Sequence, residues 1–453
     1  MPCTYLHAFA FSLEVQPPAS ISGPTDTMFK TRQLLALQVA SMVMAQQSFF
    51  PEAENYRPFG PGYNYGAYPQ DFSIVGPPLE AVHDSQQPPT GIAVDNAHNI
   101  YLTYPRNSGS TKNNVVICTD FNNEAPWPNA TIQNCTIGQD PSTCFVNVMN
   151  VVLDALGRLW IVDSGIPAGG TSPIPGGAKI MSFNQTTAVH LQTYTIPAAL
   201  LASNNFINDV RINTTLGPAG YAFLADESTN SSLLSIDLAT GTTLRRLFNT
   251  SVVRADDKYV GSYNGQPIYL WNGTRKSYAQ TGADGMALAS GNFYWGVLAS
   301  RRFYYVNQEL FVNPNLTDEE LLAAVQDPGQ CASEQAGFSA DDAGRVYISA
   351  SEQNAIYYVD TLQSQVDDVV DGIPAGNASS SSLAPVPVEN YVVKTLVRNA
   401  MIQHADTLAI LDGWLYFCTN QLELSPGRQY RNTDMRRGPF RSFRVWVGRG
   451  PAV

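Results

Sequence analysis

Apolar and polar residues alternate along this chain in short runs, and the runs come in pairs. In each pair an alternating apolar segment ends in a turn that holds Asp, Asn or Gly, and an aromatic-rich segment follows directly. Alternation with a period of two is typical of a β-strand with one buried face, and two such strands joined by a short turn form a β-hairpin. The pattern therefore predicts hairpins rather than long helices.

The hairpin unit occurs six times, at intervals of 52 to 76 residues. A single hairpin cannot bury both of its faces, whereas six of them stacked around one axis can. We therefore predict an all-β fold, a six-bladed β-propeller with a ligand pocket in its central channel. The six copies cover residues 90–95 with 100–104, 149–154 with 159–162, 208–213 with 221–224, 284–289 with 293–295, 336–341 with 346–349, and 407–412 with 414–417.

The two ends of a propeller chain commonly pair to close the ring. The candidate partners here are Asp71–Val75 and Ser442–Val447.

The beginning of the chain differs from the propeller repeats. Residues 28–45 place Lys30 and Arg32 before an apolar run and end in Ala45, which is the pattern of a secretory signal peptide, although an ordinary buried helix is the alternative. We assign residues 1–27 to an upstream extension, 28–45 to the signal peptide and 46–453 to a single propeller domain. No other segment reaches the roughly 18 apolar residues of a membrane span. We expect a secreted or secretory-pathway protein without an integral membrane segment after cleavage.

The net charge of the chain limits the classes of molecule that we expect it to bind. Its 453 residues include 38 acidic and 26 basic side chains, a formal net charge of −12. This sign disfavours phosphate backbones, so we expect a small-molecule substrate and no nucleic acid. We interpret the Arg-rich end, residues 427–453, as a solvated segment. The oligomeric state stays open.

Sequons and cysteines agree with export. Nine Asn-x-Ser/Thr sequons predict a glycoprotein. Cys135 and Cys144 flank a short loop and are the first candidates for a disulfide, Cys331 with Cys418 is a second pair, and Cys118 is expected to be a buried thiol. Since no Cys-x-x-Cys or Cys/His array occurs, the sequence does not predict a zinc site of that kind.

The candidate site residues open the six repeats, where the inner strand of each blade starts at one end of the channel. For single acids, holding turn amides is an equally good role, but convergence on one axis favours a ligand site. His404 is our candidate proton shuttle. The predicted catalytic residues are His404, Asp284 and Asp209; the predicted ligand-binding residues are Thr90, Asn150, Asn208, Gln335, Asp406, Phe338 and Trp295, with Glu334 close by.

Several segments resemble the yellow/major royal jelly protein family, in a form that looks fungal. The likeness extends from about residue 90 to 420. The segments that carry it are Thr90–Asp95 with Tyr104–Arg106, Leu156–Gly165, Thr281–Ala289 with Leu298–Tyr305, and Ala336–Phe338 with Gln353–Ile356.

The resemblance implies a secreted propeller with a channel pocket and leaves three functions open. The first is an enzyme that directs a hetero-Diels–Alder cycloaddition between an o-quinone methide and a terpene alkene, as in tropolone-sesquiterpenoid pathways. The alternatives are a dopachrome-type isomerase and a non-catalytic binder of small aromatic amines. We expect no cofactor and no metal, although Asp209, Asp284, Asp406 and Glu334 could supply oxygen ligands to calcium in the manner of lactonase-type propellers.

Overall fold

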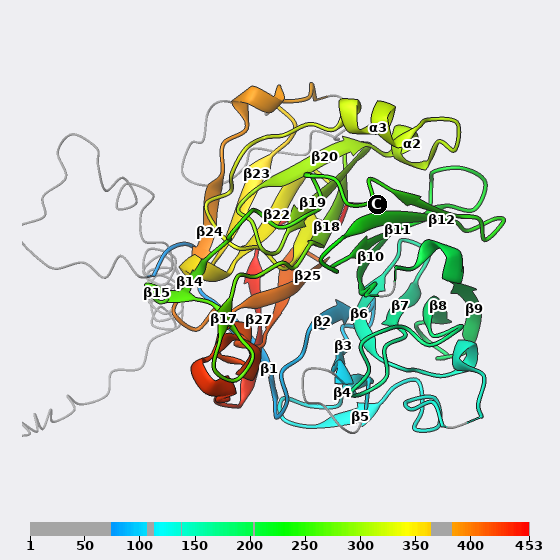
Figure 1. Ribbon diagram of the computed structural model, residues 1–453, viewed down its shortest axis with the longest axis horizontal. Helices are drawn as coiled ribbons and strands as arrows, with labels where there is room; N and C mark the ends of the chain where they lie inside the picture. Colours follow the sequence, from blue (N-terminus) through cyan, green and yellow to red (C-terminus); the bar gives the residue numbers. More distant parts are fainter. Residues whose placement is uncertain (1–73, 107–112, 137, 203, 364–382, 453) are drawn as a thin grey trace, which may run out of the picture. The chain divides into compact units, whose positions relative to one another are not determined.

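The computed structural model describes residues 74–106, 113–136, 138–202, 204–363 and 383–452. Within these ranges the strands form six antiparallel sheets of three or four strands, which are the blades of a six-bladed β-propeller (Figure 1). The predicted fold class is confirmed. The predicted extension and signal peptide lie outside the described residues.

Blades 1 to 3 each have four strands in sequence order. Their strands are β2 (Gly91–Val94), β3 (Ile100–Thr103), β4 (Val115–Cys118) and β5 (Glu124–Pro126); β6 (Val148–Leu153), β7 (Arg158–Ser164), β8 (Ala178–Asn184) and β9 (His190–Thr195); and β10 (Ile207–Asn213), β11 (Tyr221–Asp226), β12 (Ser232–Asp237) and β13 (Thr243–Arg246). All three contain a predicted hairpin as their two inner strands.

Blades 4 to 6 follow the same plan with one irregularity. Blade 4 has three strands, and two isolated bridges pair residues 302 and 305 with residues 330 and 326 on its outer side. The strands are β18 (Ala283–Ala289), β19 (Asn292–Val297) and β20 (Phe303–Asn307); β21 (Phe338–Ala340), β22 (Arg345–Ala350), β23 (Ala355–Asp360) and β24 (Lys394–Arg398); and β25 (Ala405–Leu411), β26 (Trp414–Thr419) and β27 (Phe440–Trp446), with β1 (Glu80–Ser85) outermost.

The hairpin turns of blades 1, 2 and 5 share an Asp that directly follows the inner strand. The Asp95 carboxylate accepts hydrogen bonds from the amides two and four residues later, both at 2.9 Å, and from the Tyr101 hydroxyl at 2.8 Å. The same pattern recurs for Asp154 with Trp160 Nε1 and for Asp341 with the Tyr347 hydroxyl. An Asp side chain favours such turns because it binds local backbone amides. The acids at these turns are therefore structural.

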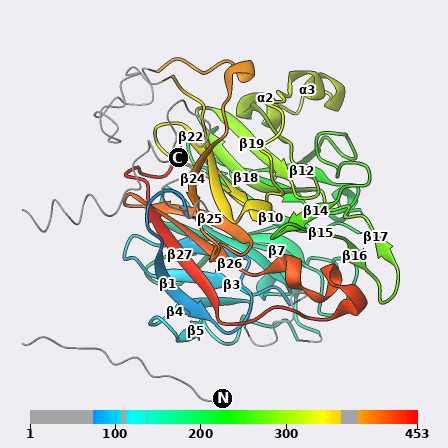
Figure 2. The same cartoon turned by 90° about the vertical axis from the view of Figure 1, so that its left-hand side faces the viewer.

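The ring closes where β1 pairs with β27, visible as the blue and red strands side by side in Figure 2. Arg441 reinforces the junction with two hydrogen bonds of 2.6 Å to the Asp84 carboxylate. The prediction was right for the C-terminal partner and wrong for the N-terminal one, because Val75 pairs with Arg398 instead. The other residues of the predicted strand, 71–73, lie outside the described residues. An outermost strand has only one neighbour, so β1 carries little apolar alternation.

The Arg-rich end of the chain is part of this closing blade. Arg428 is only 7% exposed and bonds Glu334 at 2.5 Å, while Arg444 bonds Glu80 at 2.7 Å. The prediction of a solvated end is therefore wrong for Arg428, because the 3-10 segment that carries it folds back against Glu334. Arg444 remains half-exposed on β27.

Two insertions enlarge the connections between strands. Hairpins β14 (Gly261–Tyr263) with β15 (Gln266–Ile268) and β16 (Leu270–Trp271) with β17 (Lys276–Ser277) precede blade 4, and the 3-10 helices η8 (Leu422–Leu424), η9 (Pro426–Arg428) and η10 (Tyr430–Asn432) precede β27. The insertions touch, since the Trp271 and Tyr430 rings lie 5.0 Å apart. The other short helices are α2 (Gln308–Val312), α3 (Asp318–Ala324), η3 (Pro141–Thr143), η4 (Ala198–Leu200), η5 (Ser351–Gln353) and η7 (Val388–Asn390).

The cysteines follow the predictions in part. Cys135 and Cys144 form a disulfide with their Cα atoms 5.2 Å apart, as predicted. The predicted Cys331–Cys418 pair is wrong, because each is a buried free thiol in a different core cluster between blades. Cys118 is a half-buried free thiol. Among the described residues, the helices are all too short or too polar to span a membrane.

Candidate functional site

The inner strands of four blades carry a β-bulge at their start. Register with the neighbouring strand shifts between residues 148 and 150, 207 and 210, 283 and 286, and 405 and 408. A bulge turns side chains out of the regular alternation and often lies beside functional sites. Four predicted residues lie in the bulges of blades 3, 4 and 6: Asn208, Asp209, Asp284 and Asp406.

Contacts between neighbouring inner strands join these positions around the axis. Thr90 Oγ1 donates to the Met149 carbonyl at 2.6 Å. The next two contacts are amide to carboxylate, from Asn150 Nδ2 to Asp209 Oδ1 and from Asn208 Nδ2 to Asp284 Oδ1. The structure thus brings the predicted residues of blades 1 to 4 together.

Backbone contacts complete the circle through blades 5 and 6. A Cβ atom on Gly337 would lie 1.7 Å from the Asp406 carbonyl oxygen, so this close approach requires glycine. Thr407 Oγ1 then donates to the Thr90 carbonyl at 2.7 Å and returns the circle to blade 1. We call the group that lies at this level the acidic ring: Thr90, Asn150, Asn208, Asp209, Glu227, Asp284 and Asp406.

Burial, together with repulsion between neighbouring carboxylates, raises the pKa values of the acids of the ring. Burial, reinforced by the Asp406 carboxylate, raises the pKa of Glu227 to about 8 against the opposing effect of Arg428. Burial raises the pKa of Asp406 to about 7, although His404 lowers it. The pKa of Asp284 is raised by burial, then by Glu227 and Asp406. At neutral pH the ring therefore holds protons on part of its carboxyl groups.

Asp209 is the ring acid with a basic partner on its own strand. Its Oδ1 bonds Arg211 Nη1 at 2.9 Å, and its Oδ2 accepts the Met286 amide at 3.2 Å. Burial still raises its pKa. Arg211 also reaches across the channel to the Phe338 carbonyl at 2.6 Å. These contacts make Asp209 a link between blades rather than a free base.

A second charged group interacts with the ring and contains His404. His404 Nδ1 lies 2.7 Å from Glu423 Oε1, and Arg428 Nη1 lies 2.5 Å from Glu334 Oε1. Burial lowers the pKa of His404, but the Glu423 carboxylate outweighs this and the net shift is upward. The pKa of Glu423 is lowered, because His404 outweighs the effect of its burial. His404 and Glu423 thus stabilise each other as an ion pair.

The two groups together carry an excess of acid. Their acids are Asp209, Glu227, Asp284, Glu334, Asp406 and Glu423, six side chains in all, against three basic side chains, Arg211, Arg428 and His404. Thr90, Asn208, Glu227 and Asp406 are only half-buried. Part of the acid-rich group is therefore exposed to solvent.

Three predicted residues lie away from the acidic ring. The rings of Phe338 and Trp295 are wholly buried in core clusters between blades, and Trp295 Nε1 bonds the Val252 carbonyl at 2.8 Å. Gln335 is fully buried, and its Nε2 donates to the Arg302 carbonyl at 2.5 Å. Packing accounts for these three side chains, and their contact with a ligand stays a prediction.

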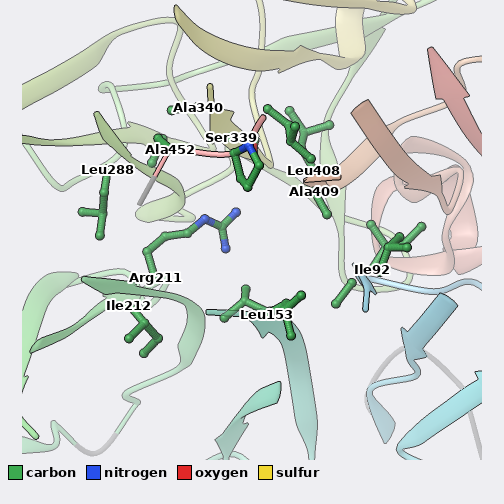
Figure 3. A pocket seen from close by; sticks show the side chains of 16 residues that line it. Ile92, Leu153, Arg211, Ile212, Leu288, Ser339, Ala340, Leu408, Ala409 and Ala452 are labelled. Atoms are coloured by element: carbon green, nitrogen blue, oxygen red, sulfur yellow. The ribbon is translucent and has the colours of Figure 1, made fainter. Parts of the chain in front are cut away.

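The opposite end of the inner strands contains a cavity of about 100 Å³. Figure 3 shows the Arg211 guanidinium extending into it between Leu153 and Ser339. The last described residues cross this end, since the Ala452 amide donates to the Ala340 carbonyl at 2.9 Å. Apart from Arg211 and Ser339 its lining is apolar, so it differs in chemistry from the acidic ring.

Sequence reasoning missed Glu227, Glu423 and Arg428. Glu227 directly follows the second strand of blade 3, so a search limited to inner strands passes over it. Glu423 and Arg428 come from the 3-10 insertion of blade 6, and their place in the site follows only from how that insertion folds back.

Comparison with known proteins identifies a family and several distant relatives. A profile of the family described as "Major royal jelly protein" matches residues 146–392. The chain is 28% identical over 199 residues to major royal jelly protein 1 of Apis mellifera, covering 38% of this chain and 39% of that protein. It is 24% identical over 227 residues to protein yellow of Drosophila guanche, covering 48% of this chain and 38% of that protein. The matched part thus spans less than two fifths of each relative.

Among solved structures, a luciferin-regenerating enzyme aligns with 83% of this chain and 98% of its own. The TM-score is 0.45 and the sequence identity is 11%.

Proposed function

The chain belongs to the major royal jelly protein family, and we propose that it binds one small organic molecule at the acidic ring. The observation that carries this proposal is the collection of half-buried polar groups from different blades at one level of the channel. Convergent polar groups on a rigid scaffold are the usual basis of a small-molecule site. The inter-blade contacts hold these groups in place before a ligand arrives.

We propose further that the ligand is an o-quinone methide and that the protein directs its hetero-Diels–Alder cycloaddition with a terpene alkene. This addition forms one C–C and one C–O bond, and no group leaves. It gains from orientation of the two reactants and from a hydrogen bond to the carbonyl oxygen of the heterodiene. Glu227 supports this role, since a half-buried carboxyl with a pKa of about 8 carries a proton to donate at neutral pH.

Binding of a small aromatic amine is the second candidate, and the charge balance favours it. The six acidic side chains outnumber the three basic ones, so among the described residues three carboxyl groups lack a basic partner even when His404 is protonated. An ammonium group beside Glu227, Asp284 and Asp406 would favour the ionised form of one of these carboxyl groups, which would release its proton to solvent and pair with the cation.

A dopachrome-type isomerase stays a prediction with less direct support. Its proposed shuttle, His404, is fully buried and already bonded through Nδ1 to Glu423. A substrate would have to reach its other ring nitrogen.

Two substitutions of Glu227 separate the two candidates. Glu227→Gln removes the ionisable carboxyl group and keeps an N–H donor, whereas Glu227→Ala removes both the carboxyl group and the donor. We would generate an o-quinone methide beside an alkene and measure product ratio and stereochemistry, and in parallel titrate dopamine and serotonin calorimetrically. Glu309→Gln, on the exposed face of α2, is the control for a surface change.

If the ring directs cycloaddition, the wild type changes the product distribution, Glu227→Gln keeps part of this effect and Glu227→Ala loses it. If the ring binds amines, both variants weaken binding at least tenfold. A wild type that neither alters the products nor binds an amine contradicts both candidates. Loss of dopachrome absorbance on addition of the wild type would select the isomerase instead.

We also propose that the chain is a glycoprotein of the secretory pathway. The Cys135–Cys144 disulfide supports this, because disulfides persist in oxidising compartments. The sequon residues Asn129, Asn249 and Asn315 are exposed and available to a glycosyltransferase. Enzymatic removal of N-glycans from the secreted protein should lower its mass, and an unchanged mass would contradict the proposal.

A further inference from the structure

Three side chains next to the acidic ring form a compact group of nitrogen and oxygen atoms. Glu334 precedes β21, His404 directly precedes β25, and Glu423 lies in η8. Each offers one ligand atom within 4.8 Å of those of the other two. Their exposed fractions are 2%, 0% and 1%. Three distant segments of the chain thus place one imidazole and two carboxylates together out of contact with solvent.

Two atoms of this group lack a partner among the residues that the structure describes. They are His404 Nε2 and Glu423 Oε2, both fully buried. The great majority of buried polar atoms in proteins form at least one hydrogen bond, because leaving one unpaired costs about 1–3 kcal/mol. Two such atoms in one three-residue cluster point to a partner from outside the chain.

Hydrogen bonds from the surrounding chain hold the Glu334 side chain and the backbone of Glu334 and Glu423 in place. Arg428 holds Glu334 Oε1 at 2.5 Å, and the Glu334 amide donates to Glu352 Oε2 at 2.8 Å. Gln429 Nε2 holds the Glu423 carbonyl at 2.7 Å. Such outer contacts orient the ligands of a metal site and strengthen binding.

We propose that Glu334, His404 and Glu423 bind one divalent transition-metal ion, with zinc as the fitting representative. One imidazole nitrogen with two carboxylate oxygens suits zinc, which commonly takes three protein ligands and a water, whereas calcium and magnesium prefer oxygen ligands alone. Ligand atoms about 2.0–2.2 Å from zinc lie at most about 4.4 Å from one another. Small side-chain movements bring the group within that range.

Proton balance is part of this binding step. His404 loses one proton to solvent when one of its ring nitrogens takes the metal, and Glu423 and Glu334 each supply a carboxylate oxygen. The two carboxylates match the charge of the ion, and Arg428 stays paired with the outer oxygen of Glu334. The site lies next to the acidic ring but shares no residue with it, and the zinc titration uses no substrate of the proposed function, so either proposal can fail alone.

The test uses the full chain after removal of metals with a chelator. Titration with zinc chloride, followed by calorimetry and elemental analysis, should show one zinc per chain that excess magnesium or calcium does not displace. Glu423→Gln and Glu334→Gln should each weaken zinc binding at least tenfold. Asp341→Asn removes a buried carboxylate in the turn of blade 5 and should bind zinc as the wild type does.

Absence of stoichiometric zinc uptake by the wild type would overturn the proposal, as would a wild-type zinc affinity in both Gln variants. If the variants do not fold, crystals of the wild type soaked in zinc decide the question. An anomalous peak between the three side chains supports the site, and a peak only elsewhere overturns it.

Discussion

The two ends of the inner strands use acidic residues in opposite ways. Asp154, after the end of β6, accepts hydrogen bonds from two backbone amides at 2.9 Å and from Trp160 Nε1 at 2.7 Å. Burial raises the pKa of Asp284, at the start of β18, and the neighbouring acids Glu227, Asp406 and Asp209 raise it further. Asp154 stabilises the fold through its hydrogen bonds, whereas Asp284 is buried beside other acids that disfavour its ionised form. The partners of an Asp, rather than its position in a repeat, determine its role.

The largest expected effect comes from the turn. Asp154→Asn keeps an acceptor for the two amides but places Nδ2 against the buried Trp160 Nε1 and against Arg158, so donors face donors. We expect a loss of about 2–3 kcal/mol in the free energy of unfolding, measured by urea denaturation.

The matched control is the corresponding turn of blade 6. Asp412 is 67% exposed there and pairs with the half-exposed His98. Asp412→Asn should change the free energy of unfolding by less than about 0.5 kcal/mol. Equal losses in the two variants would show that the Trp160 contact is not what makes the turn acid structural.

The acidic ring predicts an effect on stability that depends on pH and is smaller per pH unit than the loss expected for Asp154→Asn. Glu227 has a folded pKa of about 8 against an ordinary value of 4.5, so between these values the folded chain holds a proton that the unfolded chain has lost. Stability should therefore fall as pH rises through this window, by at most about 1.4 kcal/mol per pH unit for one group, and level off above pH 8. Glu227→Gln should flatten the slope. Urea denaturation from pH 5.5 to 8.5 measures it.

Glu309→Gln on α2 serves as the control here and should keep the wild-type slope. A wild-type slope in Glu227→Gln would mean that Glu227 is ionised in the folded protein, contrary to the argument from burial.

Sequence patterns predicted the blades well because each inner hairpin is a local unit. Asp95 with Tyr101 and Asp154 with Trp160 lie six residues apart, so the signal of the turn stands within one short window. The acidic ring was predicted in part, since Asn208, Asp284 and Asp406 open inner strands. Contacts between distant segments leave no such local signal. Glu423 reaches the site only because its insertion folds back, and β1 finds β27 across 357 residues, the separation of Asp84 and Arg441.

The smallest predicted effect concerns the neutral contacts of the ring. The Thr90 hydroxyl donates to the Met149 carbonyl, which also accepts from the Thr103 hydroxyl at 2.8 Å, so Thr90→Val leaves this carbonyl a donor. In Thr407→Val the Thr90 carbonyl likewise keeps one hydrogen bond, from the amide of residue 407. Each variant should lose about 1 kcal/mol or less in urea denaturation and keep the pH slope of the wild type, because hydroxyl groups do not titrate in this range. A loss as large as that of Asp154→Asn would mean that the ring is as structural as the turns, and the contrast between the two ends would fail.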